Sequence, residues 1–151
     1  MFTRTLVAGW GDMDFNAHMR NTAYLDKAAD VRMMCFAEHG FPLEAFHRLR
    51  LGPVVSRDEL EYHREVGLLQ ALVIGLAVDG LSEDGSRFRL RNAFRDAEGR
   101  LCARLTSTGG WLDLTKRRLV APPAELLAVL RALPRTDTFE VLPTSLRPEA
   151  P

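Results

Sequence analysis

Apolar residues recur on nearly every face of the stretch 22–39, and only five of its side chains before His39 are charged. A surface helix shows a narrower apolar stripe, so this pattern predicts a long helix that is mostly enclosed. Gly40 suits the position just after a helix end, and Phe41-Pro42 cannot continue the helix. A short turn is expected around residues 43–49.

After Pro53 the hydrophobic pattern changes to the alternation that is typical of strands. The clearest example is residues 86–95, where Phe88, Leu90 and Phe94 alternate with arginines. Turn residues at 82–85 and 96–100 predict two hairpins. Strands are therefore expected at residues 3–8, 54–63, 70–79, 86–95 and 101–114.

The end of the chain is rich in proline. Pro122-Pro123 suits the first turn of a helix that runs to about Leu133, and Pro134 ends it. Residues 134–151 are expected to form an extended or disordered Pro-rich tail, which leaves one domain over residues 1–133. The predicted fold class is α+β: an antiparallel sheet wrapped around one long helix, with a short C-terminal helix.

Composition narrows the classes of partner. The chain has 20 basic and 20 acidic residues and no net charge, which gives no reason to expect nucleic acid or an anionic membrane as partner. No apolar run reaches membrane-spanning length and the first ten residues lack a signal-peptide pattern, so a soluble, cytoplasmic protein is expected. Cys35 and Cys102 fall in apolar surroundings and are expected to be buried thiols.

The candidate chemistry lies between the first strand and the long helix. Residues 12–24 read Asp-Met-Asp-Phe-Asn-Ala-His-Met-Arg-Asn-Thr-Ala-Tyr. Backbone N–H groups at a helix start have no intrahelical partners, and an acid beside such donors is what hydrolysis of an acyl group requires. We therefore expect the segment 12–24 to form an active site.

The segment also has simpler explanations. Asn21 or Thr22 suits an N-cap with no other role. A calcium loop fails, because its sixth and twelfth positions are Ala17 and Ala23 instead of Gly and Glu. A metal site on Asp12, Asp14 and His18 has no complementary cluster elsewhere in the chain, so no metal and no cofactor are expected.

The order strand, Asp-x-Asp-x-x-x-His-x-x-Asn-x-x-Tyr, helix and four long strands resembles the hot-dog fold thioesterases of the 4-hydroxybenzoyl-CoA thioesterase type, over roughly residues 3–122. The resemblance implies that Asp14 is the catalytic carboxylate, that His18, Asn21 and Tyr24 occupy family positions, and that the N–H around Asn21 polarises the thioester carbonyl. The chain departs from the family's common His-Val-Asn-Asn sequence, because it has Met19 and Arg20 after His18. Its loop at residues 67–70 also lacks the acidic residue often found there.

The expected activity is hydrolysis of an acyl-CoA, with Asp14 either attacking the carbonyl or removing a proton from water. His18 is expected to orient Asp14 or the helix start. Candidate substrate contacts are Ser56, Asp58 and Leu60 for the pocket wall, Met33 and Phe36 for its far end, and Lys116, Arg117 and Arg118 for the CoA phosphates. The stripe of Arg87, Arg89 and Arg91 is a second candidate set for the phosphates, although its pattern favours a solvated outer sheet face.

Assembly and substrate class remain expectations. An uncovered sheet edge invites pairing with another copy, and the resemblance implies a homodimer or homotetramer with sites at the subunit boundary. An aliphatic acyl group is favoured, because the helix offers Met, Ala and Leu side chains without a stacking pair of aromatics. The alternatives are a non-catalytic acyl-CoA binding module and an enoyl-thioester hydratase of the same fold.

Overall fold

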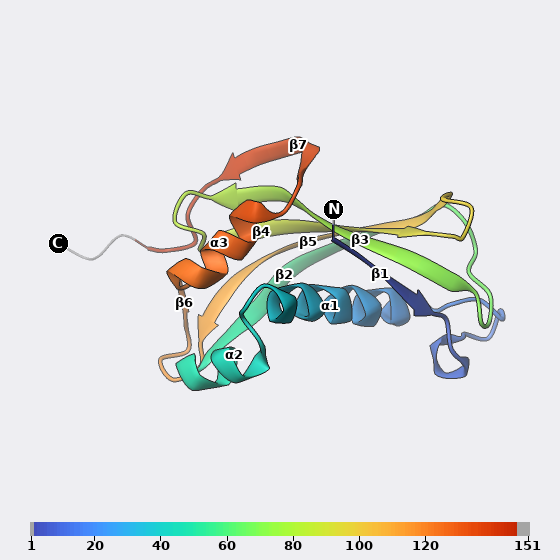
Figure 1. Cartoon of the computed structure of the whole chain (residues 1–151), viewed down its shortest axis with the longest axis horizontal. Coiled ribbons are helices and arrows are strands. Elements are labelled where there is room, and N and C mark those ends of the chain that lie inside the picture. The colour runs from blue at the N-terminus through green and yellow to red at the C-terminus, as the bar shows by residue number, and fades with distance from the viewer. Residues whose placement is uncertain (1, 148–151) are drawn as a thin grey trace.

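The computed structural model describes residues 2–147 (Figure 1). Its elements, in chain order, are β1 (Phe2–Val7), a single 3-10 turn η1 (Trp10–Asp12), α1 (Asn21–Glu38), α2 (Leu43–Leu49), β2 (Leu51–Tyr62), β3 (Ala71–Ser82), β4 (Arg87–Arg95), β5 (Leu101–Asp113), β6 (Arg118–Val120), α3 (Ala124–Ala132) and β7 (Arg135–Leu142).

One curved sheet wraps around α1, as Figure 1 shows. Its main strands run in the order β1-β3-β4-β5-β2, with β6 added to β5 and β7 added to β3. All pairings are antiparallel except that of β3 with β7. The α+β fold class predicted from the sequence, with its sheet around a long helix, is confirmed.

The core lies between α1 and the concave face of the sheet. Val31, Cys35 and Phe36 of α1 are buried there, and Leu90 and Phe94 of β4 face them. The alternation in β4 follows the prediction, because its other face carries the arginines. Both cysteines are buried and free, as expected, and burial raises the pKa of Cys35 to about 11, which keeps that thiol protonated.

The end of the chain differs from the expected tail. Residues 135–142 form β7, which runs parallel to β3 and pairs with it at Val78 and at Gly80 to Ser82. This is the edge of β3 that β1 leaves free, since β1 pairs only as far as Leu76. The prolines lie on either side of β7 and none lies within it, so they delimit a strand. Residues 148–151 lie outside the described residues.

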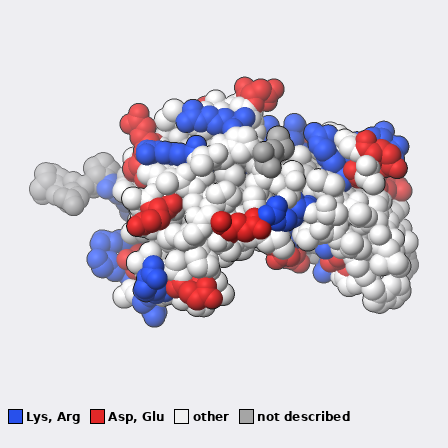
Figure 2. Space-filling model, in the orientation of Figure 1, with Lys and Arg blue, Asp and Glu red and all other residues white. Residues whose placement is uncertain are grey.

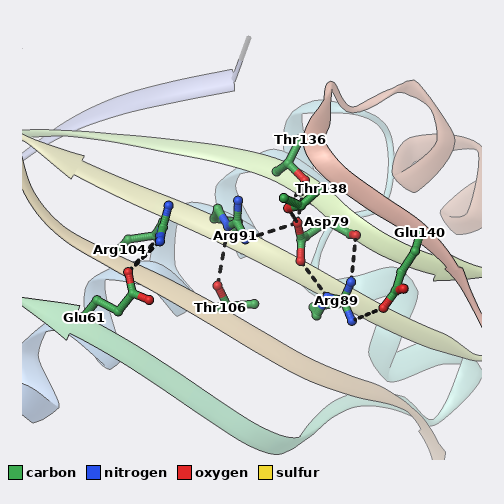
Figure 3. Close-up of polar contacts among 9 residues, drawn as sticks. All are labelled: Glu61, Asp79, Arg89, Arg91, Arg104, Thr106, Thr136, Thr138 and Glu140. Carbon is green, nitrogen blue, oxygen red and sulfur yellow. Dashed lines mark hydrogen bonds and ion pairs between the residues drawn. The ribbon is translucent and has the colours of Figure 1, made fainter.

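A polar cluster on the sheet face opposite α1 fastens β7 to the sheet (Figure 3). The buried carboxylate of Asp79 contacts Nε of Arg89 at 2.6 Å and Nη2 of Arg91 at 3.2 Å. It also accepts hydrogen bonds from the hydroxyl groups of Thr136 and Thr138 on β7. Two members of the predicted arginine stripe therefore hold the sheet together.

The surface carries charges of both signs. Figure 2 shows basic and acidic side chains interspersed over one face of the molecule, next to an extended uncharged area. Among residues 2–147, none of the helices has the length and apolar character needed to cross a membrane.

Candidate active site

The segment between β1 and α1 forms a tight loop around Asp14. The Asp14 N–H donates to the carbonyl oxygen of His18 at 2.8 Å, and Ala17 takes a left-handed conformation with φ of 62° to close the turn. Oδ1 of Asp14 accepts the N–H groups of Asn16 at 2.8 Å and His18 at 3.1 Å. Within the described residues Oδ2 has no hydrogen-bond partner, so half of this exposed carboxylate is open for chemistry.

Asp12 has a different environment. Its Oδ2 accepts the N–H of Gly9 at 2.8 Å and lies 2.9 Å from Nζ of Lys27 on α1. Burial by itself raises the pKa of Asp12, but the Gly9 N–H and the Lys27 ammonium outweigh it and hold the pKa below its usual range. Asp12 therefore ties the loop to the helix.

The N-terminus of α1 is open. Its N-cap is Arg20, not the Asn21 or Thr22 suggested by residue type, and Arg20 makes no side-chain capping bond. The Arg20 guanidinium instead donates to the carbonyl of Gly11 and to Oγ1 of Thr22. Asn21 Oδ1 accepts the N–H of Thr22 at 2.9 Å, while the Asn21 N–H has no partner in the described part of the chain.

A cavity of about 480 Å³ opens beside this helix start. Its walls come from the loop, the first turn of α1, the end of β2 and the residues that follow β2. It is lined by Asp14, His18, Met19, Arg20, Asn21, Tyr24, Tyr62, His63, Arg64, Glu65 and Val66. The four residues that the sequence singled out at this junction thus share one cavity.

Tyr24 forms the buried side of the cavity. Its ring meets Tyr62 edge-on with centroids 5.6 Å apart and Phe94 with centroids 5.2 Å apart. Burial, followed by the nearby Cys102, Tyr62 and Asp14, raises the pKa of Tyr24 to about 12. The phenol therefore keeps its proton at neutral pH and is able to donate a hydrogen bond.

Sequence reasoning missed the residues that follow β2. Nε2 of His18 lies 3.1 Å from Oε2 of Glu65. The stretch 67–70 lacks an acid, as expected, but Glu65 stands two residues before Gly67 in the same connection between β2 and β3. A wider search of that connection would have found it.

Several predicted contacts lie elsewhere. Ser56 sits at a bulge in β2 and donates to the carbonyl of Thr108 at 3.1 Å, and Asp58 accepts the hydroxyl of Ser107 at 2.5 Å. Leu60 packs against the core. None of these three lines the cavity described above, because the cavity lies at the end of β2, where Tyr62 reaches it, and these residues stand earlier in the strand.

The basic run Lys116, Arg117 and Arg118 is also remote. It lies at the turn between β5 and β6, near α2 and at the opposite end of α1 from the loop (Figure 1). Arg117 and Arg118 line a separate groove there.

Of the two residues expected at the far end of the pocket, Phe36 lies in the core and Met33 lies at its edge. The ring of Phe36 packs 6.0 Å from both Phe46 and Trp111, measured between centroids, so Phe36 belongs to the aromatic core. Met33 is partly buried against the same core.

Comparison with known structures shows the same fold. A hypothetical protein from Staphylococcus aureus, solved in complex with CoA, superposes with a TM-score of 0.77 at 21% identity, over 98% of this chain and 89% of that one. A putative oleoyl thioesterase from Lactobacillus plantarum gives 0.80 at 19% identity, over 99% of this chain and 55% of that one. A 1,4-dihydroxy-2-naphthoyl-CoA thioesterase from Synechocystis gives 0.77 at 14% identity, over 87% and 96%.

A search of curated proteins found no match. The family model described as the thioesterase-like superfamily matches residues 8–130, which include the loop, α1 and the strands β2 to β5. That span is most of the chain and contains every residue that lines the cavity. The chain therefore belongs to the thioesterase-like superfamily, whose hot-dog fold its sheet and central helix reproduce.

Proposed function

We propose that the protein is an acyl-CoA thioesterase, which hydrolyses a thioester to a free acid and CoA. One observation carries the proposal: a single cavity joins the free oxygen of Asp14 to the open N-terminus of α1. Membership of the thioesterase-like superfamily supports it. So does the likeness of the fold to a protein solved with CoA.

The proposed mechanism uses the donors of the cavity to stabilise charge. A thioester carbonyl placed against the Asn21 N–H becomes anionic when the carbonyl carbon is attacked, and one well-placed donor lowers such a barrier by roughly 3–4 kcal/mol. The positive end of the helix dipole acts in the same direction. Asp14 either attacks the carbonyl carbon or removes a proton from water, and the phenol of Tyr24 donates to the substrate.

Basic groups for the CoA phosphates are proposed at the cavity itself. Arg64 lines the cavity and forms no ion pair within the described residues, so its guanidinium is available to a phosphate. The guanidinium of Arg20 is occupied by Gly11 and Thr22. Lys116, Arg117 and Arg118 lie too far along α1 for this cavity, and they would serve only a CoA bound to a neighbouring subunit.

The proposed assembly is a homodimer or homotetramer with the site at the subunit boundary. β2 is an edge strand that pairs only with β5, and most of its residues are exposed. Trp10 and Phe15 belong to the segment between β1 and α1 (residues 8–20, the proposed catalytic loop) and are almost fully exposed in the single chain. A second copy would cover such apolar groups and desolvate Asp14. Light scattering that shows a stable, fully active monomer at micromolar concentration would contradict this assembly.

The acyl group is proposed to be either aliphatic or aromatic. The expectation of an aliphatic chain depended on the lack of an aromatic pair on the helix, but the fold brings Tyr62 of β2 against Tyr24 of α1. Aromatic acyl groups therefore belong beside aliphatic ones among the candidate substrates.

The test is a hydrolysis screen with short, medium, long and aromatic acyl-CoAs, in which the release of the free CoA thiol is measured. We expect turnover of at least one of these thioesters by the parent protein and loss of that turnover in Asp14→Asn. Tight acyl-CoA binding without hydrolysis would favour the binding module. Hydration of an enoyl-CoA without hydrolysis would favour the hydratase.

A further inference from the structure

We propose that Glu65 is a positioning residue that makes His18 the proton acceptor of the reaction, which leaves Asp14 as the nucleophile. This inference rests on the proposed function. The starting observation is the contact of 3.1 Å between Nε2 of His18 and Oε2 of Glu65 at the wall of the cavity.

A buried anchor enforces this contact. The N–H of Met19 donates to the carbonyl of Val66 at 2.8 Å, and both of these residues are buried. The bond joins the catalytic loop to the connection between β2 and β3. The preceding residue on each segment is a member of the pair, so His18 and Glu65 are held side by side by the backbone.

The pair has little value for stability. The side chains of His18 and Glu65 are 38% and 77% exposed, and ion pairs between such exposed groups contribute little to stability. Its effect is instead on the imidazole. A carboxylate at Nε2 favours the neutral tautomer with the proton on Nε2, which leaves the lone pair of Nδ1 free to accept a proton.

The other charged and titratable groups at the cavity do not replace Glu65 in this role. The two hydrogen bonds between Asp14 and His18 use the backbone of His18 and not its ring, since the Asp14 N–H donates to the His18 carbonyl and the His18 N–H donates to Oδ1 of Asp14. The Arg20 guanidinium donates to Gly11 and Thr22. The remaining groups are Tyr24 of α1, Tyr62 at the end of β2, and His63 and Arg64 of the following connection. Within the described residues, Glu65 is the carboxylate paired with the His18 ring.

Two steps then balance the reaction. Oδ2 of Asp14 attacks the thioester carbon, the C–S bond breaks, and CoA leaves as a thiolate, which gives a mixed anhydride on Asp14. Water then attacks the acyl carbon, one of its protons passes to Nδ1 of His18, and the bond to Asp14 breaks. The free acid is released, the Asp14 carboxylate is restored, and the proton on His18 passes to solvent, which balances the proton that the released thiolate takes from solvent. Imidazole suits the second step because it is a stronger base than a carboxylate near neutral pH.

The kinetic test compares the parent with Glu65→Ala. Only the water step uses His18, so we expect kcat and KM to fall together by about tenfold while kcat/KM stays within about twofold, with a burst of one CoA per site. Adding Glu65→Ala to His18→Ala should cause no further loss of kcat, because Glu65 acts only through His18. The matched control is Glu98→Ala, which removes another exposed glutamate, one that pairs at 3.5 Å with Arg100 and does not line the cavity.

A second readout needs no substrate. Two-bond ¹H–¹⁵N spectra of the imidazole rings, with the signal assigned by its loss in His18→Ala, should show His18 with its proton on Nε2 in the parent and a mixture of tautomers in Glu65→Ala. A proton on Nδ1 in the parent, an unchanged kcat in Glu65→Ala, the lack of a burst, or additive losses in the double variant would overturn the inference. A parent that hydrolyses none of the thioesters would overturn the proposed function instead.

Discussion

Two aspartates of this fold differ in their burial and in how many of their carboxylate oxygens have partners. Asp79 is buried on the sheet face opposite α1, and both of its oxygens are occupied, Oδ2 by Arg89 and Oδ1 by Arg91, Thr136 and Thr138 (Figure 3). Asp14 is exposed in the loop that precedes α1. Backbone N–H groups occupy its Oδ1, and Oδ2 is open within the described residues.

The difference follows from the cost of burying charge. Burial by itself raises the pKa of Asp79, but the hydroxyl groups of Thr136 and Thr138, then Arg89 and Arg91, hold it below its usual range. A carboxylate whose partners are all present fastens structure, and it has no free lone pair with which to react. A carboxylate fixed through one oxygen keeps its direction and offers the other oxygen to a substrate.

The largest effect is expected for Asp14→Asn. The amide oxygen is able to keep the two N–H bonds of the loop, so the fold should stay, whereas the reactive oxygen is lost. We expect kcat to fall by about 1,000-fold, on the order of 4 kcal/mol, with the free energy of unfolding unchanged within about 1 kcal/mol. Assays of the parent, of this variant and of the exposed-residue control Asp137→Asn would check it. Near-parental turnover in Asp14→Asn would rule out its catalytic role.

Asp79→Asn should show the opposite behaviour. It leaves Arg89 and Arg91 without their buried counter-charge and weakens the attachment of β7. We expect a loss of roughly 2–3 kcal/mol in the free energy of unfolding at pH 7, with kcat per folded molecule unchanged. Urea unfolding and the hydrolysis assay measure the two quantities. A stability equal to that of the parent would mean that the cluster is not needed to hold the strand.

The pH dependence of stability sharpens the same contrast. The pKa of Asp79 is lower in the folded chain than in the unfolded one, so its contribution is complete above the ordinary pKa of about 3.9 and is lost as the pH falls below that value. The stability gap between the parent and Asp79→Asn should therefore be constant from pH 7 to about pH 5 and narrow toward pH 3. A gap that widens on acidification would contradict the direction of the shift.

A smaller effect is expected for Tyr24→Phe. The ring contacts with Tyr62 and Phe94 would remain, and only the protonated hydroxyl at the cavity would be lost. One hydrogen bond to a substrate corresponds to about fivefold in kcat/KM, or about 1 kcal/mol. Steady-state kinetics with the best thioester from the screen would measure it. A larger loss accompanied by a lower unfolding temperature would indicate a role in packing.

The part of the site that the sequence predicted is contiguous in the chain. Asp14, His18, Asn21 and Tyr24 lie within eleven residues, counted from 14 to 24, and the loop and the first turn of α1 hold them together through local hydrogen bonds. The spacing of these residues along the chain was therefore sufficient to predict that they lie together. Tyr62 and Glu65 escaped prediction because they come from the end of β2 and the residues after it, some forty residues later, and the backbone bond between Met19 and Val66 aligns the two segments.

The same distinction applies to the fold. Periodicity indicated the enclosed helix and the alternating strands, because burial of one face is written directly into each segment. The sequence by itself did not determine that residues 135–142 would join the sheet, because that strand is stabilised by Asp79 and by the length of β3 left uncovered by β1. The sequence thus determined the elements and the proposed catalytic loop, whose interactions are local. The tertiary structure decided which distant side chains complete the cavity and which charges are neutralised, because these contacts depend on strand register and bulges that no local pattern specifies.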